Sequence, residues 1–277
     1  MMKNNLRILV LGAGPHALGH HLPALRQYRR QYPERVANVA LCDLDVAKAR
    51  HAVGAFGLDE AFADPDKALA DWKPDACIAV TPVAATANVA STVLRAGIPL
   101  LMEKPPGASV DDAEAVVRLA ADSGTPVMVS MNRRFDPVIR TALERCCGRP
   151  LHFLRGTMCR ERRIEDDFIS TTSLHCIDAM RFIGGDIDEE SVTCHAVNGN
   201  WRHASFAFTS GARGSLEIMP TCGSNRERYE IFGEGFRIRA ATCFFDDGEL
   251  EVSEGGQRPA VECFRGPRAV HELDGTL

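Results

Sequence analysis

A glycine-bearing turn close to the start of the chain restricts the possible folds more than any other part of the sequence. The apolar run Leu6–Leu11 has the length of a buried strand, and Gly12-Ala13-Gly14-Pro15-His16-Ala17 follows it, ahead of a helix-like segment that extends to about residue 31. This order fits G-x-G-x-x-(G/A), the turn that binds a dinucleotide in a Rossmann fold. Gly12 would permit the tight turn, Gly14 would let the backbone approach a pyrophosphate, and the small Ala17 would allow close helix–strand packing. The unpaired N–H groups at the helix start favour a phosphate.

An acidic residue at the end of the second predicted strand specifies the dinucleotide. Asp43 follows the apolar run Val36–Cys42, 31 residues after Gly12, which indicates a longer first helix and loop than usual. Its carboxylate could accept both ribose hydroxyls of NAD(H) and would repel the 2′-phosphate of NADP(H), so NAD(H) is the expected cofactor and NADP(H) the weaker ligand. Gly19 becomes the third glycine in place of Ala17 if the turn carries an insertion. The alternative is a glycine turn and a helix-capping Asp43 with no ligand.

Further apolar runs in the first half predict a parallel sheet. Strands are expected at 76–80, 98–102 and 126–131, and a helix is expected from an N-cap at Ser109 to about Gly124. The runs are continuous rather than alternating, which indicates parallel strands covered on both faces. We therefore predict an α/β fold that begins with a dinucleotide-binding Rossmann domain at 1–131.

After residue 132 the pattern changes to short neighbouring strands. Glycine turns at 210–211 and 233–235 are typical of antiparallel hairpins, and one helix at 172–183 interrupts the strands. This pattern predicts a C-terminal α+β domain at 132–277 with a mainly antiparallel sheet, for substrate binding and oligomerisation. We expect an open face of this sheet to pack against another subunit in a homodimer or homotetramer. The predicted strands are 151–159, 191–197, 203–209, 215–219, 229–232 and 236–241.

Composition narrows the classes of partner. The chain has 277 residues and a formal net charge of −5, which argues against a nucleic-acid surface. No uncharged stretch is long enough to span a bilayer, and the first residues do not resemble a signal peptide, so we expect a cytoplasmic protein without a membrane partner. The ten cysteines are scattered and form no C-x-x-C pair, so reduced thiols and no metal site are expected. His20 and His21 are adjacent on a helix and cannot chelate together, so one should pack and the other be exposed.

Four motifs together resemble one enzyme family. Leu101-Met102-Glu103-Lys104-Pro105-Pro106 lies at a predicted strand end. With the glycine turn, it resembles the Gfo/Idh/MocA (glucose–fructose oxidoreductase / inositol dehydrogenase) family, in which Glu-Lys-Pro closes the strand beside the nicotinamide. Asn132-Arg133-Arg134-Phe135-Asp136-Pro137 is similar to the family's segment at the domain crossing. His175-Cys176-Ile177-Asp178 resembles its H-x-x-D motif, and Phe232-Gly233-Glu234-Gly235 a late sheet turn. The resemblance covers nearly the whole chain.

The resemblance implies roles for particular side chains. Lys104 would bind the substrate oxygen beside the cofactor, His175 would transfer the proton, and Asp178, one helical turn later, would orient the imidazole. Without the resemblance, His175 and Asp178 would be interpreted as structural residues. Besides Gly12, Gly14, Ala17 and Asp43, the implied cofactor residues are Thr81, Pro82, Glu103, Lys104 and Asn132. The implied substrate residues are Lys104, Arg134, Thr171 and His175.

Two departures from the family pattern leave the substrate open. Thr171 stands where the family often has an acid before the catalytic His, and Thr86 stands where it often has a His. The leading hypothesis is an NAD(H)-dependent oxidoreductase acting on a secondary alcohol or carbonyl of a sugar, cyclitol or related polar small molecule. The alternatives are a biosynthetic C=O or C=N reductase, or a non-catalytic protein that senses a dinucleotide or ligand. Lys104 and His175 favour an enzyme, whereas the missing acid at Thr171 favours a sensor.

Overall fold

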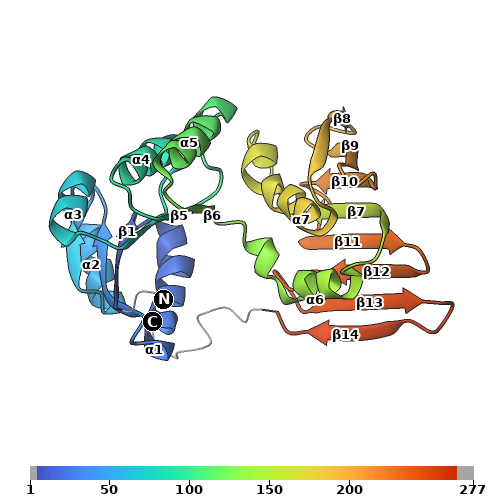
Figure 1. Ribbon diagram of the computed structural model, residues 1–277, viewed down its shortest axis with the longest axis horizontal. Coiled ribbons are helices and arrows are strands. Elements are labelled where there is room, and N and C mark those ends of the chain that lie inside the picture. Colours follow the sequence, from blue (N-terminus) through green and yellow to red (C-terminus); the bar gives the residue numbers. More distant parts are fainter. Residues whose placement is uncertain (1–4, 267–277) are drawn as a thin grey trace. The chain divides into compact units, whose positions relative to one another are not determined.

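The computed structural model describes residues 5–266 and divides into two compact units, 1–130 and 131–277. The first unit contains a six-stranded sheet and the second an eight-stranded sheet (Figure 1). Residues 1–4, from the stretch in which no signal peptide was recognised, lie outside the described residues, as do residues 267–277 of the expected C-terminal domain.

The sheet of the first unit is parallel throughout. Its strands pair in the order β3-β2-β1-β4-β5-β6, which is the order of a Rossmann fold, so the predicted fold class is confirmed. The strand order reverses between β1 and β4, and ligands of such sheets bind outside the strand ends at this point. The short β3 was not predicted. The strands are β1 (Leu6–Leu11), β2 (Val36–Cys42), β3 (Glu60–Phe62), β4 (Ala76–Ala79), β5 (Leu100–Met102) and β6 (Val127–Val129).

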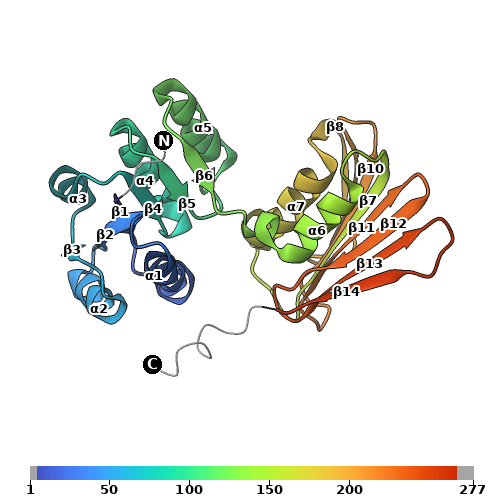
Figure 2. The same cartoon turned by 60° about the horizontal axis from the view of Figure 1, so that its bottom comes forward.

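Helices cover both faces of this sheet (Figure 2). Leu9 and Val10 are neighbours on β1 that point to opposite faces, and both are fully buried. Leu9 packs in the core beneath α3 and α4, and Val10 in the core beneath α1 and α2. Two-sided burial is the reason the strands appear as continuous apolar runs. The helices are η1 (Ala17–His21), α1 (Leu22–Gln31), α2 (Val46–Phe56), α3 (Pro65–Trp72), α4 (Val83–Arg95) and α5 (Val110–Ser123).

The predicted caps of α5 are confirmed. The Ser109 hydroxyl accepts a hydrogen bond from the backbone N–H of Asp112, which satisfies one of the unpaired donors at the helix start. Gly124 ends the helix at a φ of 63°, a left-handed conformation that glycine adopts without steric cost. Both signals are local in the sequence, which is why they could be predicted.

The second unit is built on a mainly antiparallel sheet, as predicted. The strand order is β14-β13-β12-β11-β7-β10-β9-β8, and within the described part of this unit β7 and β10 are the one pair that runs parallel. β13, β14 and α6 were not predicted. The strands are β7 (Leu151–Cys159), β8 (Ile187–Ala196), β9 (Arg202–Phe208), β10 (Arg213–Met219), β11 (Arg226–Gly233), β12 (Phe236–Ala241), β13 (Gly248–Glu254) and β14 (Ala260–Phe264). The helices are η2 (Asn132–Phe135), α6 (Pro137–Cys146), η3 (Ile169–Ser173) and α7 (Leu174–Gly184).

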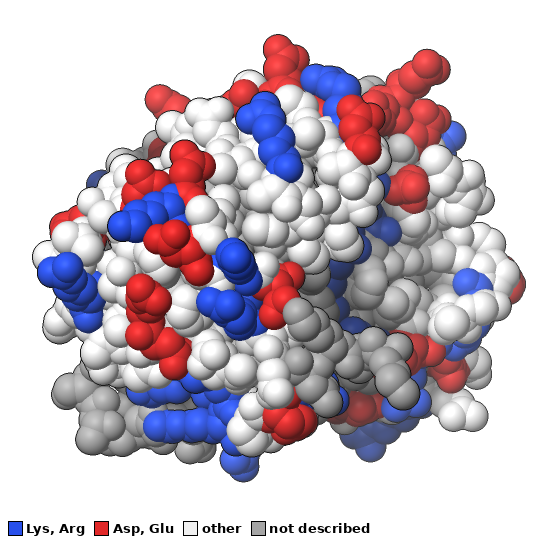
Figure 3. Space-filling model, turned by 60° about the vertical axis from the view of Figure 1, so that its left-hand side comes forward, with Lys and Arg blue, Asp and Glu red and all other residues white. Residues whose placement is uncertain are grey.

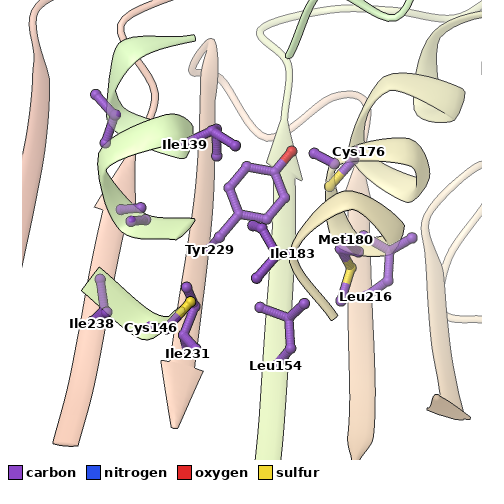
Figure 4. Packing of buried hydrophobic residues seen from close by; sticks show 14 of the residues in the cluster. Ile139, Cys146, Leu154, Cys176, Met180, Ile183, Leu216, Tyr229, Ile231 and Ile238 are labelled. Atoms are coloured by element: carbon purple, nitrogen blue, oxygen red, sulfur yellow. The ribbon is translucent and has the colours of Figure 1, made fainter. Parts of the chain in front are cut away.

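The core of the second unit lies between this sheet and the helices α6 and α7. Tyr229 of β11 is fully buried between Ile139 of α6 and Cys176 of α7 (Figure 4). Burial raises the pKa of Tyr229 well above its usual value and that of the Cys176 thiol to about 12, so both groups are neutral near pH 7. This core holds α7, the helix of the H-x-x-D motif, on the sheet.

Charged side chains of both signs lie on the face of the molecule that Figure 3 shows. Acidic and basic side chains are interspersed there (Figure 3). Within residues 5–266, none of the helices combines the length and the apolar character that a membrane crossing requires.

Candidate active site

A cavity of about 620 Å³ opens at the carboxyl ends of the central strands of the first unit. Its size falls within the range of about 300–1,000 Å³ that is typical of small-molecule sites. Among the predicted cofactor residues, those that line it are Gly12, Gly14, Asp43, Thr81, Pro82, Glu103 and Lys104. Ala17 is fully buried at the start of η1, and Asn132 belongs to the second unit. The turn that was predicted from sequence therefore forms one wall of this cavity.

The two glycines of the turn meet different requirements. Gly12 has a φ of 108°, and a Cβ atom there would lie 2.2 Å from the carbonyl oxygen of Val80, so no other residue fits. Apart from its two neighbours in the chain, no atom of residues 5–266 lies within 4 Å of where a Cβ atom at Gly14 would be, and Gly14 lines the cavity. Gly12 thus brings the turn against the end of β4, while Gly14 leaves the backbone open to a ligand. This arrangement fits a pyrophosphate group.

The Asp43 carboxylate is held toward the glycine turn. One oxygen, Oδ2, accepts a hydrogen bond of 2.7 Å from the backbone N–H of Ala13, and Oδ1 accepts one of 2.9 Å from the N–H of Asp45. Each carboxylate oxygen has two lone pairs, so both can accept a further hydrogen bond from a ribose hydroxyl. The side chain is fixed in place by the turn and remains available to the ligand.

Glu103 and Lys104 follow β5 and line the same cavity. The Glu103 side chain is 11% exposed, and its Oε1 lies 2.8 Å from Nε2 of His21 and 3.4 Å from Nε2 of His16. Burial alone would raise the pKa of Glu103, but hydrogen bonds from His16, His21 and Ser130 lower it well below its usual value. Glu103 is therefore ionised near pH 7, and its carboxylate contacts the histidines at the start of the first helix.

This histidine pair could not be predicted from the period of a regular α-helix. The helix makes a π turn at η1, where the backbone N–H of Leu22 bonds to the carbonyl of Ala17, five residues earlier. His16 and His21 are also five residues apart, and the wider turn lets both reach Glu103. His20 is exposed and the side chain of His21 is 15% exposed, as expected of one surface residue and one packed residue. The sequence signal for this irregularity was Gly19, which would replace Ala17 as the third glycine if the turn carried an insertion.

The predicted substrate residues of the second unit lie on η2, η3 and α7. His175 and Asp178 are both buried and one turn apart on α7. Nε and Nη2 of Arg134 donate hydrogen bonds of 2.8 and 2.6 Å to the two oxygens of Asp178, in the bidentate geometry that fixes a guanidinium. The Arg134 guanidinium also lies 5.3 Å from the ring centre of Phe182. Asp178 thus holds Arg134, and its action on His175 stays a prediction.

Both threonines that depart from the family pattern bond to nearby backbone. Oγ1 of Thr171, in η3, donates a 2.8 Å hydrogen bond to the carbonyl of Asp167. Oγ1 of Thr86 is buried in α4 and donates a 3.1 Å hydrogen bond to the carbonyl of Pro82. Each hydroxyl can still accept a hydrogen bond, but neither can serve as an acid or base near neutral pH.

Beside Arg134, the side chain of Arg133 enters a buried ionic network. Arg133 donates hydrogen bonds of 2.9 and 2.6 Å to Glu227 and one of 2.8 Å to the side-chain oxygen of Asn132. Arg160 also contacts Glu227. Burial alone would raise the pKa of Glu227, but its hydrogen bonds and the charges of Arg133 and Arg160 lower it. The network joins η2 to the sheet and holds the side chain of the predicted cofactor residue Asn132.

Comparisons with known proteins show which sequences and folds this chain resembles. Residues 6–131 match a family model described as an oxidoreductase family with an NAD-binding Rossmann fold, GFO_IDH_MocA. An inositol 2-dehydrogenase from Arthrobacter sp. strain FB24 is 32% identical over 93% of this chain and 76% of its own length. A D-apiose dehydrogenase from Paraburkholderia graminis is 26% identical over 86% of this chain, and the chain spans 64% of that relative's length.

A similar fold occurs in a solved oxidoreductase from Agrobacterium radiobacter, crystallised with NAD+, L-tartaric acid and magnesium. The TM-score is 0.76, the sequence identity is 20%, and the similarity covers 93% of this chain and 79% of that chain. At this identity the comparison shows the fold, and it extends over both units.

Proposed function

Because the chain belongs to the Gfo/Idh/MocA family of oxidoreductases, we propose that it is an NAD(H)-dependent dehydrogenase of a sugar, cyclitol or related polar small molecule. It would transfer a hydride to or from a secondary alcohol or carbonyl. The observation that carries this proposal is the cavity at the switch point of the Rossmann sheet, with Gly12, Gly14, Asp43 and Lys104 in its wall. The names of the inositol and D-apiose dehydrogenases support the substrate class.

The cofactor would be held by the turn and by the end of β2. When bound, NAD(H) supplies the hydride acceptor or donor. Backbone N–H groups at Gly14 and the helix start would bind its pyrophosphate, since a helix N-terminus favours anions. Asp43 would accept the ribose hydroxyls and disfavour a 2′-phosphate. Thr81 and Pro82 line the same cavity after β4 and would contact the cofactor beside them.

Three side chains would act on the substrate. Lys104 would bind the reacting oxygen through its ammonium group, and an imidazole nitrogen of His175 would hold or release the proton. Arg134 would donate hydrogen bonds to other substrate hydroxyls: a guanidinium has five N–H donors, and the Asp178 pair uses two. In this proposal Asp178 positions Arg134, and the hydroxyl of Thr171 is a further substrate contact.

The proposed function is tested by following nicotinamide absorbance with a panel of polyols, sugars and keto compounds. We expect reduction of NAD+ by at least one polyol or sugar, and slower turnover with NADP+. Reduction of keto or imine compounds alone, with no alcohol oxidised, would indicate a biosynthetic reductase. Tight NADH binding without turnover in either direction would indicate a sensor and contradict the proposal.

We also propose a homodimer or homotetramer in the cytoplasm. The sheet face opposite α6 and α7 carries pairs of opposite charge, such as Arg155 with Glu230 and Arg237 with Glu251, and a second copy could match them. All ten cysteines are free thiols, which supports a reducing compartment. Light scattering on the protein as it elutes from a size-exclusion column would measure its molar mass and so the number of subunits. A monomer at micromolar concentration would contradict this part of the proposal.

A further inference from the structure

We propose that His16, His21 and Glu103 form a binding site for a divalent transition metal, with zinc as the best match, at the wall of the cavity. The three ligand atoms, one from each side chain, all lie within 4.8 Å of one another. Two imidazoles and a carboxylate are a known zinc ligand set, and three protein ligands leave a fourth position for water. The inference does not depend on the proposed dehydrogenase activity.

The π turn creates the site. In a regular α-helix, residues three and four apart share a face, whereas His16 and His21 are five apart. At η1 the hydrogen bond itself spans five residues, which lets Nε2 of both rings reach the same carboxylate oxygen, at 3.4 and 2.8 Å. π turns occur frequently at functional sites, and this one brings two zinc ligands together.

The arrangement needs little change to accept an ion. Zinc binds nitrogen and oxygen ligands at about 2.0–2.2 Å in a tetrahedron, so its ligand atoms lie about 3.4 Å apart. His21 and Glu103 are already closer than this, and the His16 side chain is 55% exposed, so its ring can move toward them. Both rings would bind through unprotonated Nε2, with the ring proton on Nδ1. A metal would replace the proton between His21 and Glu103.

The charges around the ligands are mixed. The Glu103 carboxylate is the anion among the three ligands, and Lys104 lines the same cavity next to it. The ring of His20 packs 4.7 Å from that of His16 but does not belong to the ligand cluster. His20 therefore offers a matched control on the same helix turn.

The test is a calorimetric titration of the chelator-treated 277-residue chain with Zn²⁺. Exposed thiols are alkylated beforehand, because Cys147, Cys194 and Cys263 are exposed and would bind zinc themselves. We expect one equivalent of Zn²⁺ to bind. His16→Asn should weaken the affinity for Zn²⁺ at least about tenfold, because losing a residue that only hydrogen-bonds to a metal ligand already costs about this much. His20→Asn should retain wild-type affinity.

A second measurement, thermal unfolding, distinguishes a loss of zinc binding from a loss of folding. His16 is exposed, so His16→Asn should melt at the wild-type temperature without metal but should gain less stability from added Zn²⁺. Absence of stoichiometric binding to the wild-type protein would overturn the proposal and leave a hydrogen-bonded pair of histidines on Glu103. Equal zinc affinity in wild type and His16→Asn, or a loss of affinity in His20→Asn instead, would overturn this ligand set.

Discussion

Asp43 is the residue expected to decide between the two dinucleotides. Its carboxylate is anchored by the N–H groups of Ala13 and Asp45 and lines the cavity. We predict that Asp43→Ser narrows the preference for NADH over NADPH by roughly tenfold or more, since a hydrogen bond to a charged group contributes about 1.5–3 kcal/mol. Calorimetric affinities for both dinucleotides measure this ratio. Asp45→Ser is the control, because serine preserves the helix cap that Asp45 makes. Tighter binding of NADPH than NADH by the unaltered protein would refute the role of Asp43.

Lys104 is the proposed contact to the reacting oxygen. We predict that Lys104→Ala folds and binds NADH but turns over more slowly by roughly 10²–10⁴-fold, as for a lost acid–base group. Steady-state kinetics on the best substrate of the panel measure the loss, and Lys67→Ala, an exposed lysine on α3, is the control. Turnover of Lys104→Ala within a few-fold of wild type would remove Lys104 from the mechanism.

The site residues that could be predicted from sequence are those fixed by local patterns. Gly12, Gly14 and Asp43 follow strands whose apolar runs are unmistakable, so the cavity they line could be placed in advance. The pair of Arg134 and Asp178 spans 44 residues, and that of His21 and Glu103 spans 82. Such pairs depend on tertiary packing and, at η1, on a π turn that the helical period does not reveal.

In the turn between β1 and the first helix, Gly12 and Gly14 have different roles, one in folding and one in ligand binding. We predict that Gly12→Ala destabilises the fold, because the new Cβ atom would lie 2.2 Å from the carbonyl of Val80 at a φ that alanine avoids. The Cβ atom of Gly14→Ala would meet nothing among the described residues beyond its chain neighbours, so this variant should keep wild-type stability and weaken NADH binding. Thermal unfolding and an NADH titration of both variants measure the difference. Equal stability of Gly12→Ala and wild type would contradict the close approach.

The buried network of Arg133, Glu227 and Arg160 ties η2 to β11 and to the residue that follows β7. We predict that Glu227→Gln costs about 3–5 kcal/mol of unfolding free energy at pH 7, because it leaves two buried guanidinium groups without a counter-ion. Glu227 has a lowered pKa in the fold, so its contribution is present above its unfolded-state pKa and is lost as pH falls below that value.

Urea unfolding at several pH values measures this effect. The stability difference between wild type and Glu227→Gln should shrink as pH falls below about 4.3, the ordinary glutamate pKa. The control is Glu230→Gln on the same strand, whose partly exposed pairs with Arg155 and Arg239 should contribute at most about 1 kcal/mol. A difference that does not depend on pH would show that the charge of Glu227 is not what stabilises the network.

Strands could be predicted from the sequence where a single hydrophobic periodicity dominates. The strands β1, β2, β7 and β12 were predicted with the bounds that the structure has, because their apolar positions are buried against helices. β14 is an edge strand whose residues are exposed or half-buried, so hydrophobic periodicity gives little signal there. β3 has only three residues, which is too short for a pattern to be distinguished.

For the whole molecule, the order of elements sufficed to predict the fold class. The alternation of strands with helices predicted the parallel sheet, and the succession of short strands predicted the mainly antiparallel one. Family membership then rests on similarity along most of the chain, including 93% of it with an inositol 2-dehydrogenase. In the proposed function, the choice of substrate would depend on the contacts that Arg134, Thr171 and His175 make with it, and the sequence motifs do not specify these contacts.

We claim that the protein transfers a hydride between a polyol or sugar and NAD(H), and the fate of a carbon-bound deuterium tests this transfer. The best substrate of the panel is deuterated at its carbinol carbons and incubated with the protein and NAD+, and the cofactor is analysed by mass spectrometry. We predict that the NADH formed carries one deuterium from the substrate, and that Lys104→Ala gives the same product more slowly. NADH without deuterium, or deuterium lost to water while the nicotinamide stays oxidised, would contradict the claim.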